Sequence, residues 1–186
     1  NRSGKLYNVV SYTVDPETGQ IDYDQVEALA KEHRPKFIIA GYSSYPWAVD
    51  WKRFRDIAHS VGALLFADIA HVAGLVAGGV YPSPVGYADV ITFTTHKSLC
   101  GPRGACILTT DPALAKKIDR AVFPGEQGGP HVNSILAIAV ALKLAAEPQF
   151  KQLQQQIVKN CAAFTERFKE LGFRIPYGGT NTHLMN

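Results

Sequence analysis

Short apolar runs alternate with helical patterns along this chain, and that alternation constrains the fold most. The runs cover residues 37–40, 63–67, 88–94 and 104–109. Helical spacing of apolar residues fills the segments before the first two runs, at 22–32 and 51–61. Alternating helices and buried strands predict an α/β protein, a three-layer α/β/α arrangement around a mainly parallel sheet. The short connection before Gly104 predicts one antiparallel neighbour.

Several local patterns predict where elements begin and end. Tyr7–Tyr12 alternates weakly and predicts a strand, and Phe37–Ala40 is expected to be a strand buried on both faces. Asp22 and Asp50 are positioned to cap the two helices. A long helix is expected from about 133 to 147 and a Gln-rich amphipathic helix from 148 to about 171, followed by a strand at Phe173–Ile175.

The change of pattern in the last third predicts two domains. Residues 1–150 would form the large domain, and residues 151–186 a linking helix and the start of a smaller carboxyl-terminal domain. The chain begins with Asn1 rather than Met, and we expect it to be part of a longer protein.

Composition narrows the class of protein. The formal charge is +3 and the basic residues are dispersed, so no nucleic acid is expected as a partner. The longest apolar stretches, such as 61–67 and 135–146, are too short or too interrupted to span a membrane, so no membrane is expected either. Three cysteines at unmatched spacings argue against a disulfide framework or a zinc site. We therefore expect a protein of a reducing compartment, the cytoplasm.

Polar residues directly follow the apolar runs. In open α/β sheets, ligands bind at the carboxyl ends of the strands, so these residues are the best candidates for function. They are Ser43, Asp68, His71, His96 and Lys97.

Lys97 and Asp68 are the most informative pair. A partly buried lysine at a strand end loses hydration, which lowers its pKa and frees the amine as a nucleophile for Schiff-base chemistry. A carboxylate beside a dry strand needs a cation opposite it, and a protonated pyridine ring is such a cation. The alternatives are a lysine whose amine reaches solvent and an aspartate that caps the segment Ala70–Ala77.

The neighbouring residues give weaker signals. His71 lies three residues after Asp68 and could stack on a cofactor ring, although a lone histidine is more often structural. Thr94 and His96 could donate to a phosphate or phenolic oxygen, while threonine is also simply common in strands. The glycines of the segment 125–130 precede a helix and could bind an anion. Arg103 could bind a carboxylate or phosphate, or could be a solvated surface residue.

Five segments carry a resemblance to the serine hydroxymethyltransferase family. TTHKSLCGPRG at 94–104 looks very much like its lysine signature, and DIAHVAGLVAGG at 68–79 resembles its aspartate and histidine segment. The other matching segments are 11–23, 41–45 and 123–130, and the similarity extends to GGTNTH at 178–183. The resemblance covers the whole chain.

The resemblance implies a cofactor and a set of roles. Lys97 would hold pyridoxal phosphate, Asp68 would pair with the pyridine nitrogen, and His71 would stack on the ring and touch substrate. Ser43 would bond the phenolic oxygen, with His96 and Thr94 close to the phosphate and Arg103 near the substrate. Gly128 and Gly129 would reach the phosphate of a neighbouring subunit, in a homodimer or homotetramer with shared active sites. No metal is implied.

The implied fold is the aspartate-aminotransferase type, fold type I, and the implied reaction converts serine and tetrahydrofolate into glycine and 5,10-methylenetetrahydrofolate. Cys100 departs from the family, which more often has Arg or Ala there. The family's amino-terminal segment and its substrate-binding arginine are absent, so the chain alone is not expected to be active. The alternatives are a threonine aldolase-like enzyme, a methylserine-specific transferase, and a non-catalytic homologue.

Overall fold

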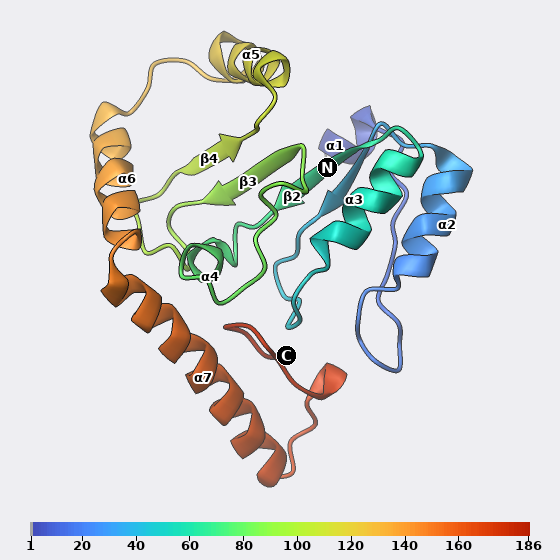
Figure 1. The fold of residues 1–186 in the computed structure, drawn as a ribbon, viewed down its shortest axis with the longest axis vertical. Coiled ribbons are helices and arrows are strands. Elements are labelled where there is room, and N and C mark those ends of the chain that lie inside the picture. Colours follow the sequence, from blue (N-terminus) through green and yellow to red (C-terminus); the bar gives the residue numbers. More distant parts are fainter. Residues whose placement is uncertain (1) are drawn as a thin grey trace.

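A four-stranded sheet lies at the centre of the computed structural model, which describes residues 2–186 (Figure 1). The strands follow one another in the order of the sequence: β1 (Phe37–Ala40), β2 (Leu64–Asp68), β3 (Val90–Thr94) and β4 (Ala105–Leu108). β1, β2 and β3 are parallel, and β4 runs antiparallel to β3. The predicted α/β class, the mainly parallel sheet and its antiparallel neighbour are confirmed.

Two helices, α2 (Tyr23–His33) and α3 (Trp51–Ser60), pack on one side of the sheet (Figure 1). Both begin at the predicted caps: Asp22 accepts a hydrogen bond from the Gln25 amide and Asp50 from the Arg53 amide, each at 2.9 Å. Phe54 of α3 and Leu65 of β2 are fully buried in the core that forms between them. This packing holds the strands whose carboxyl ends carry the candidate site.

The opposite face of the sheet is largely open. Burial alternates along β1, where Ile38 and Ala40 are buried while Phe37 is 43% and Ile39 51% exposed. The expectation that Phe37–Ala40 is buried on both faces is therefore wrong. A strand's second face is buried only where another layer covers it, and the described residues leave this side of the predicted three-layer arrangement largely open.

Two predicted strands are also wrong. Tyr7–Tyr12 forms no strand and follows the short helix α1 (Arg2–Leu6), and Phe173–Ile175 is irregular and leads into η2 (Pro176–Gly178). A strand needs a partner to complete its ladder of hydrogen bonds. Tyr12 instead bonds to β1 through its side chain, donating from its hydroxyl to the Ile39 carbonyl at 2.8 Å.

The remaining helices follow β2 and β4. α4 (Ala73–Ala77) follows β2, and after β4 come α5 (Pro112–Arg120), η1 (Ala121–Glu126), α6 (Val132–Ala145) and α7 (Pro148–Glu170). The long helices predicted near 133–147 and 148–171 are confirmed as α6 and α7. They run along one side of the sheet and below it (Figure 1).

The last residues turn back from α7 toward the loop after β1 (Figure 1). There Asn181 donates its amide to the Pro46 carbonyl at 3.1 Å, and the Asn186 side chain donates to the Ser44 carbonyl at 2.9 Å. The carboxyl-terminal segment thus lies against the loop that carries Ser43. The division into domains at residue 150 stays a prediction.

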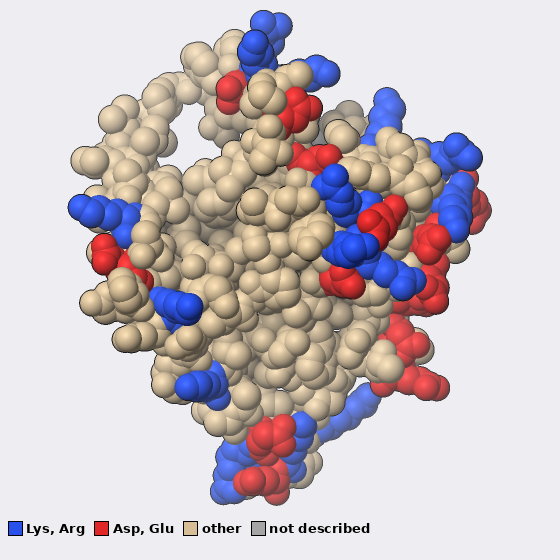
Figure 2. All heavy atoms as spheres, viewed as in Figure 1, with Lys and Arg blue, Asp and Glu red and all other residues tan. Residues whose placement is uncertain are grey.

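Acidic and basic side chains are interleaved over α2, α3 and the far end of α7, and the centre of the same view carries few charges (Figure 2). None of the helices within residues 2–186 combines the length and the apolar character that a membrane span requires.

Candidate active site

Three parallel strands end at one edge of the sheet, and their loops bring the predicted residues together. Asp68 is the last residue of β2, Ser43 lies in the exposed loop after β1, and Lys97 follows β3. β1 and β2 pair as far as Ala40 and Ala67, and β2 and β3 as far as Asp68 and Thr92, so the three exits are neighbours. The structure thus confirms the expected position of these residues at the carboxyl edge.

Lys97 and Asp68 both act electrostatically on His71. Burial lowers the pKa of His71 below its ordinary value of 6.5, the positive charge of Lys97 lowers it further, and the carboxylate of Asp68 partly opposes both. The imidazole of His71 is therefore neutral at neutral pH. A neutral imidazole can accept a proton or lie flat against a ring.

Asp68 does not cap a helix. Its Oδ1 accepts from the Ala70 amide at 3.1 Å in a local turn, whereas α4 begins only at Ala73, after the N-cap residue Val72, and has no side-chain cap. The alternative in which Asp68 caps Ala70–Ala77 is therefore wrong. Its carboxylate lies at the sheet edge and is half-buried.

The loop that carries Lys97 is tightly bonded. The Cys100 amide donates to the Lys97 carbonyl at 2.9 Å and the Gly101 amide to the Thr95 carbonyl at 2.7 Å. Thr95 is 0% exposed and donates its hydroxyl to the Pro102 carbonyl at 2.6 Å. Within residues 2–186, no group lies within hydrogen-bonding or ion-pair distance of the Lys97 amine, which is therefore available to a ligand.

Ser98 joins the loop that carries Lys97, residues 95–104 (the lysine loop), to the Asp68–His71 segment. The sequence did not predict this role. Its hydroxyl donates to the His71 carbonyl at 2.7 Å and accepts from the Gly74 amide at 3.0 Å. Gly74 permits this approach, because a Cβ there would lie 2.1 Å from the Ser98 carbonyl oxygen. The sequence shows a serine next to the lysine, but it does not predict that this serine bonds to His71 and Gly74.

The other predicted residues differ in how far the structure brings them to Lys97. His96 Nε2 lies 3.4 Å from an Arg103 nitrogen and its Nδ1 3.5 Å from the Gly104 amide, so Arg103 lies beside His96. Both contacts are long, and a neutral imidazole accepts only one of them. The Thr94 hydroxyl already donates to the Ala70 carbonyl at 3.3 Å, which ties β3 to the Asp68–His71 turn.

Gly128 and Gly129 lie elsewhere. Both are exposed in the loop between η1 and α6, which runs along the side of the molecule between α5 and α6, away from α4 (Figure 1). No atom lies within 4 Å of a Cβ added at either glycine. The chain itself does not bring them to Lys97.

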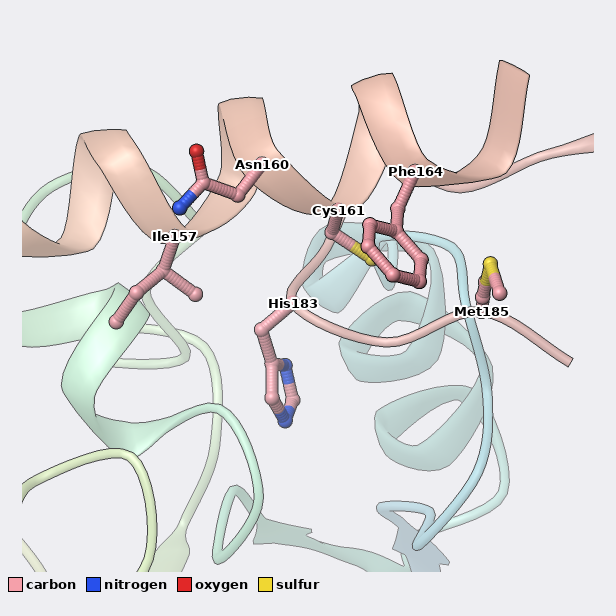
Figure 3. Close-up of a pocket in the computed structure, with 6 residues that line it drawn as sticks. All are labelled: Ile157, Asn160, Cys161, Phe164, His183 and Met185. Carbon is pink, nitrogen blue, oxygen red and sulfur yellow. The ribbon is translucent and has the colours of Figure 1, made fainter. Parts of the chain in front are cut away.

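A histidine from the end of the chain was missed. His183 lines a cavity of about 370 Å³ between α7 and the carboxyl-terminal segment, and its ring points away from α7 (Figure 3). Burial lowers its pKa, and the nearby His71 lowers it further. Its Nδ1 is buried and has no hydrogen-bond partner among the described residues. Nothing in the local sequence predicts that residue 183 returns to the vicinity of residue 71.

The fold and the site together define an α/β protein whose candidate site lies at the carboxyl edge of a mainly parallel sheet. A free amine, a carboxylate and a neutral imidazole suit a ligand with an aldehyde and a basic aromatic ring. The described residues contain no group of three or more His, Cys, Asp or Glu that could hold a metal ion.

Comparison with known proteins identifies the family. A profile described as serine hydroxymethyltransferase matches residues 1–186. The chain is 60% identical over 185 residues to a serine hydroxymethyltransferase of Psychrobacter sp. (strain PRwf-1), with 100% of this chain and 44% of the relative covered. It is 57% identical over 185 residues to the one of Methylococcus capsulatus, with 99% and 44% covered. The chain belongs to the serine hydroxymethyltransferase family and spans less than half of these relatives' length.

Proposed function

We propose that the protein containing this chain is a pyridoxal phosphate-dependent serine hydroxymethyltransferase. It would transfer the hydroxymethyl carbon of serine reversibly to tetrahydrofolate and release glycine. The observation that carries the proposal is the unpartnered amine of Lys97 beside Asp68 and His71 at the sheet edge, in a chain of this family. The names of the relatives support the same reaction.

Each residue has a role in this proposal that follows from its chemistry. Lys97 would hold the cofactor covalently, and Asp68 would keep a proton on the pyridine nitrogen by its negative charge. His71 would lie against the ring and contact substrate in its neutral form. When bound, pyridoxal phosphate would supply a ring that accepts electrons as a substrate bond breaks. Ser43, His96 and Thr94 would provide polar contacts to the cofactor, and Arg103 would bind the substrate.

A shared active site is part of the proposal. α6 exposes Ile135, Leu136 and Val140, and the loop before it carries Gly128 and Gly129, where an added Cβ would meet no described atom within 4 Å. An exposed apolar helix beside free backbone amides suits contact with a second subunit. We propose a homodimer or homotetramer in which these glycines face the partner's phosphate. The cytoplasmic location stays a prediction.

The test is visible absorbance of the full-length protein on addition of pyridoxal phosphate. We expect a band in the wild type that the Lys97→Ala variant lacks, with activity lower by more than about 10³-fold. Lys116→Ala on the exposed side of α5 is the matched control and should behave as wild type. No band in the wild type would overturn the proposal. Glycine α-proton exchange that does not respond to tetrahydrofolate would favour a threonine aldolase-like enzyme instead.

A further inference from the structure

Gln154 of α7 is a fully buried polar residue in direct contact with the lysine loop. It is 0% exposed, and its side-chain nitrogen donates to the carbonyl of Ser98, the residue after Lys97, at 3.1 Å. The other buried residues of α7, Phe150 and Thr165, lie four positions before and eleven after it and so on the same face of the helix. Gln154 therefore occupies a core position of α7.

Packing alone does not explain an amide at this position. The side-chain oxygen of Gln154 is buried and has no hydrogen-bond partner among residues 2–186. A buried, unpaired carbonyl destabilises the folded state, and an apolar side chain of the same length, such as Met, would fill the space without it. The hydrogen bond to Ser98 is what distinguishes glutamine from methionine here.

The surrounding chain is shaped to permit this contact. A Cβ at Gly78, just after α4, would lie 2.7 Å from the Gln154 Cβ, so only glycine lets α7 approach so closely. Ser98 is at the same time bonded to the His71 carbonyl and the Gly74 amide. Ser98 is thus bonded on one side to the segment after β2 and on the other side to Gln154 of α7.

We propose that Gln154 is a positioning residue for Lys97. It holds the Ser98 carbonyl, and with it the main chain from which the Lys97 amine projects, at a fixed position relative to Asp68 and His71. Because α7 leads to the carboxyl-terminal segment that lies on the Ser43 loop, the same bond links that segment to the lysine. The effect of Gln154 on catalysis rests on the proposed function. Its restraint of the lysine loop does not.

The experiment replaces Gln154 by Met in the full-length enzyme, with Gln155→Met, the same change at an exposed neighbour on α7, as control. Three quantities are measured: amide hydrogen exchange of the peptide 96–104 without cofactor, the rate of pyridoxal phosphate binding, and Tm. We expect about tenfold faster exchange in that peptide, about tenfold slower binding, and a Tm within about 3 °C of wild type. Gln155→Met should change none of them.

Two outcomes would overturn the proposal. Unchanged exchange in 96–104 would show that the bond does not restrain the loop. A large fall in Tm with faster exchange throughout the chain would assign Gln154 to general stability, and Gln154→Leu is the second variant if the Met variant fails to fold. If the wild type binds no pyridoxal phosphate, the proposed function fails, while the exchange result still tests the restraint of the loop.

Discussion

The lysine loop at 95–104 and the glycine-rich loop at 125–130 are both part of the family signature, yet they are built in different ways. In the first, Thr95 and Gly101 bond across the loop, and Ser98 bonds to the segment after β2. In the second, Gly128 and Gly129 are exposed, and an added Cβ would meet no atom within 4 Å.

The difference lies in what each loop needs from outside the chain. The lysine loop takes its shape from contacts among described residues, and a change there should affect folding and function together. The glycine-rich loop leads into α6, which exposes Ile135 and Leu136, and in the proposed oligomer a second subunit would contact this loop. Substitutions in the two loops, or at a residue packed against one of them, should separate these cases.

Gly74→Ala should have the largest effect. Alanine favours a helix over glycine by about 1 kcal/mol, so propensity alone predicts that α4 gains stability. The added Cβ would lie 2.1 Å from the Ser98 carbonyl oxygen, a main-chain atom that cannot move aside cheaply. We expect a net loss on the order of 2–3 kcal/mol in the free energy of unfolding, measured by denaturant titration. A variant as stable as wild type would show that the lysine loop is less rigid than its contacts indicate.

Thr95→Val should have an intermediate effect. The substitution keeps the shape but removes the hydroxyl that donates to the Pro102 carbonyl in a fully buried position. We expect a loss of about 1–2 kcal/mol and faster amide exchange around Lys97. Thr110→Val, at an exposed position after β4, is the matched control and should change stability by less than about 0.5 kcal/mol. Equal losses in the two variants would contradict the special role of Thr95.

Local patterns predicted much of this molecule. The strand runs ending at Asp68 and Thr94 and the caps at Asp22 and Asp50 depend on neighbours in sequence, and all are present. The strand predicted at Tyr7–Tyr12 failed because a strand depends on a distant partner. Burial of Phe37 failed for a related reason, since it depends on what covers the second face of the sheet.

The candidate site also contains residues that local sequence predicts and residues that depend on distant contacts. Lys97 and Asp68 could be predicted because residues at the carboxyl ends of parallel strands meet at one edge. Gln154 and His183 could not, because each comes to the site through the packing of a segment far away in sequence. A glutamine on the buried face of α7 was a signal in retrospect, but periodicity does not say what such a side chain contacts.

Gly128→Ala together with Gly129→Ala should leave the fold unchanged. Because both positions face open space, we expect the free energy of unfolding to change by less than about 0.5 kcal/mol. If the proposed shared site is right, the added Cβ atoms would hold the phosphate away from the backbone amides. The Kd for pyridoxal phosphate should then rise about tenfold, comparable to the loss of one hydrogen bond to a charged group. A large loss of stability in the double variant would show that the glycine-rich loop, like the lysine loop, is held by contacts within the chain.

The smallest effect concerns the pH dependence contributed by His71. Its pKa is lowered in the folded protein by burial and by Lys97, so the unfolded chain binds the proton more readily. Its contribution to stability is complete above the ordinary value of 6.5 and is lost as the pH falls below it. His71→Asn cannot titrate, so the wild type should lose stability relative to this variant between about pH 6.5 and 5 by a few tenths of a kcal/mol. Denaturant titrations at several pH values measure the difference, and parallel curves across that range would show that burial and Lys97 do not lower the pKa of His71.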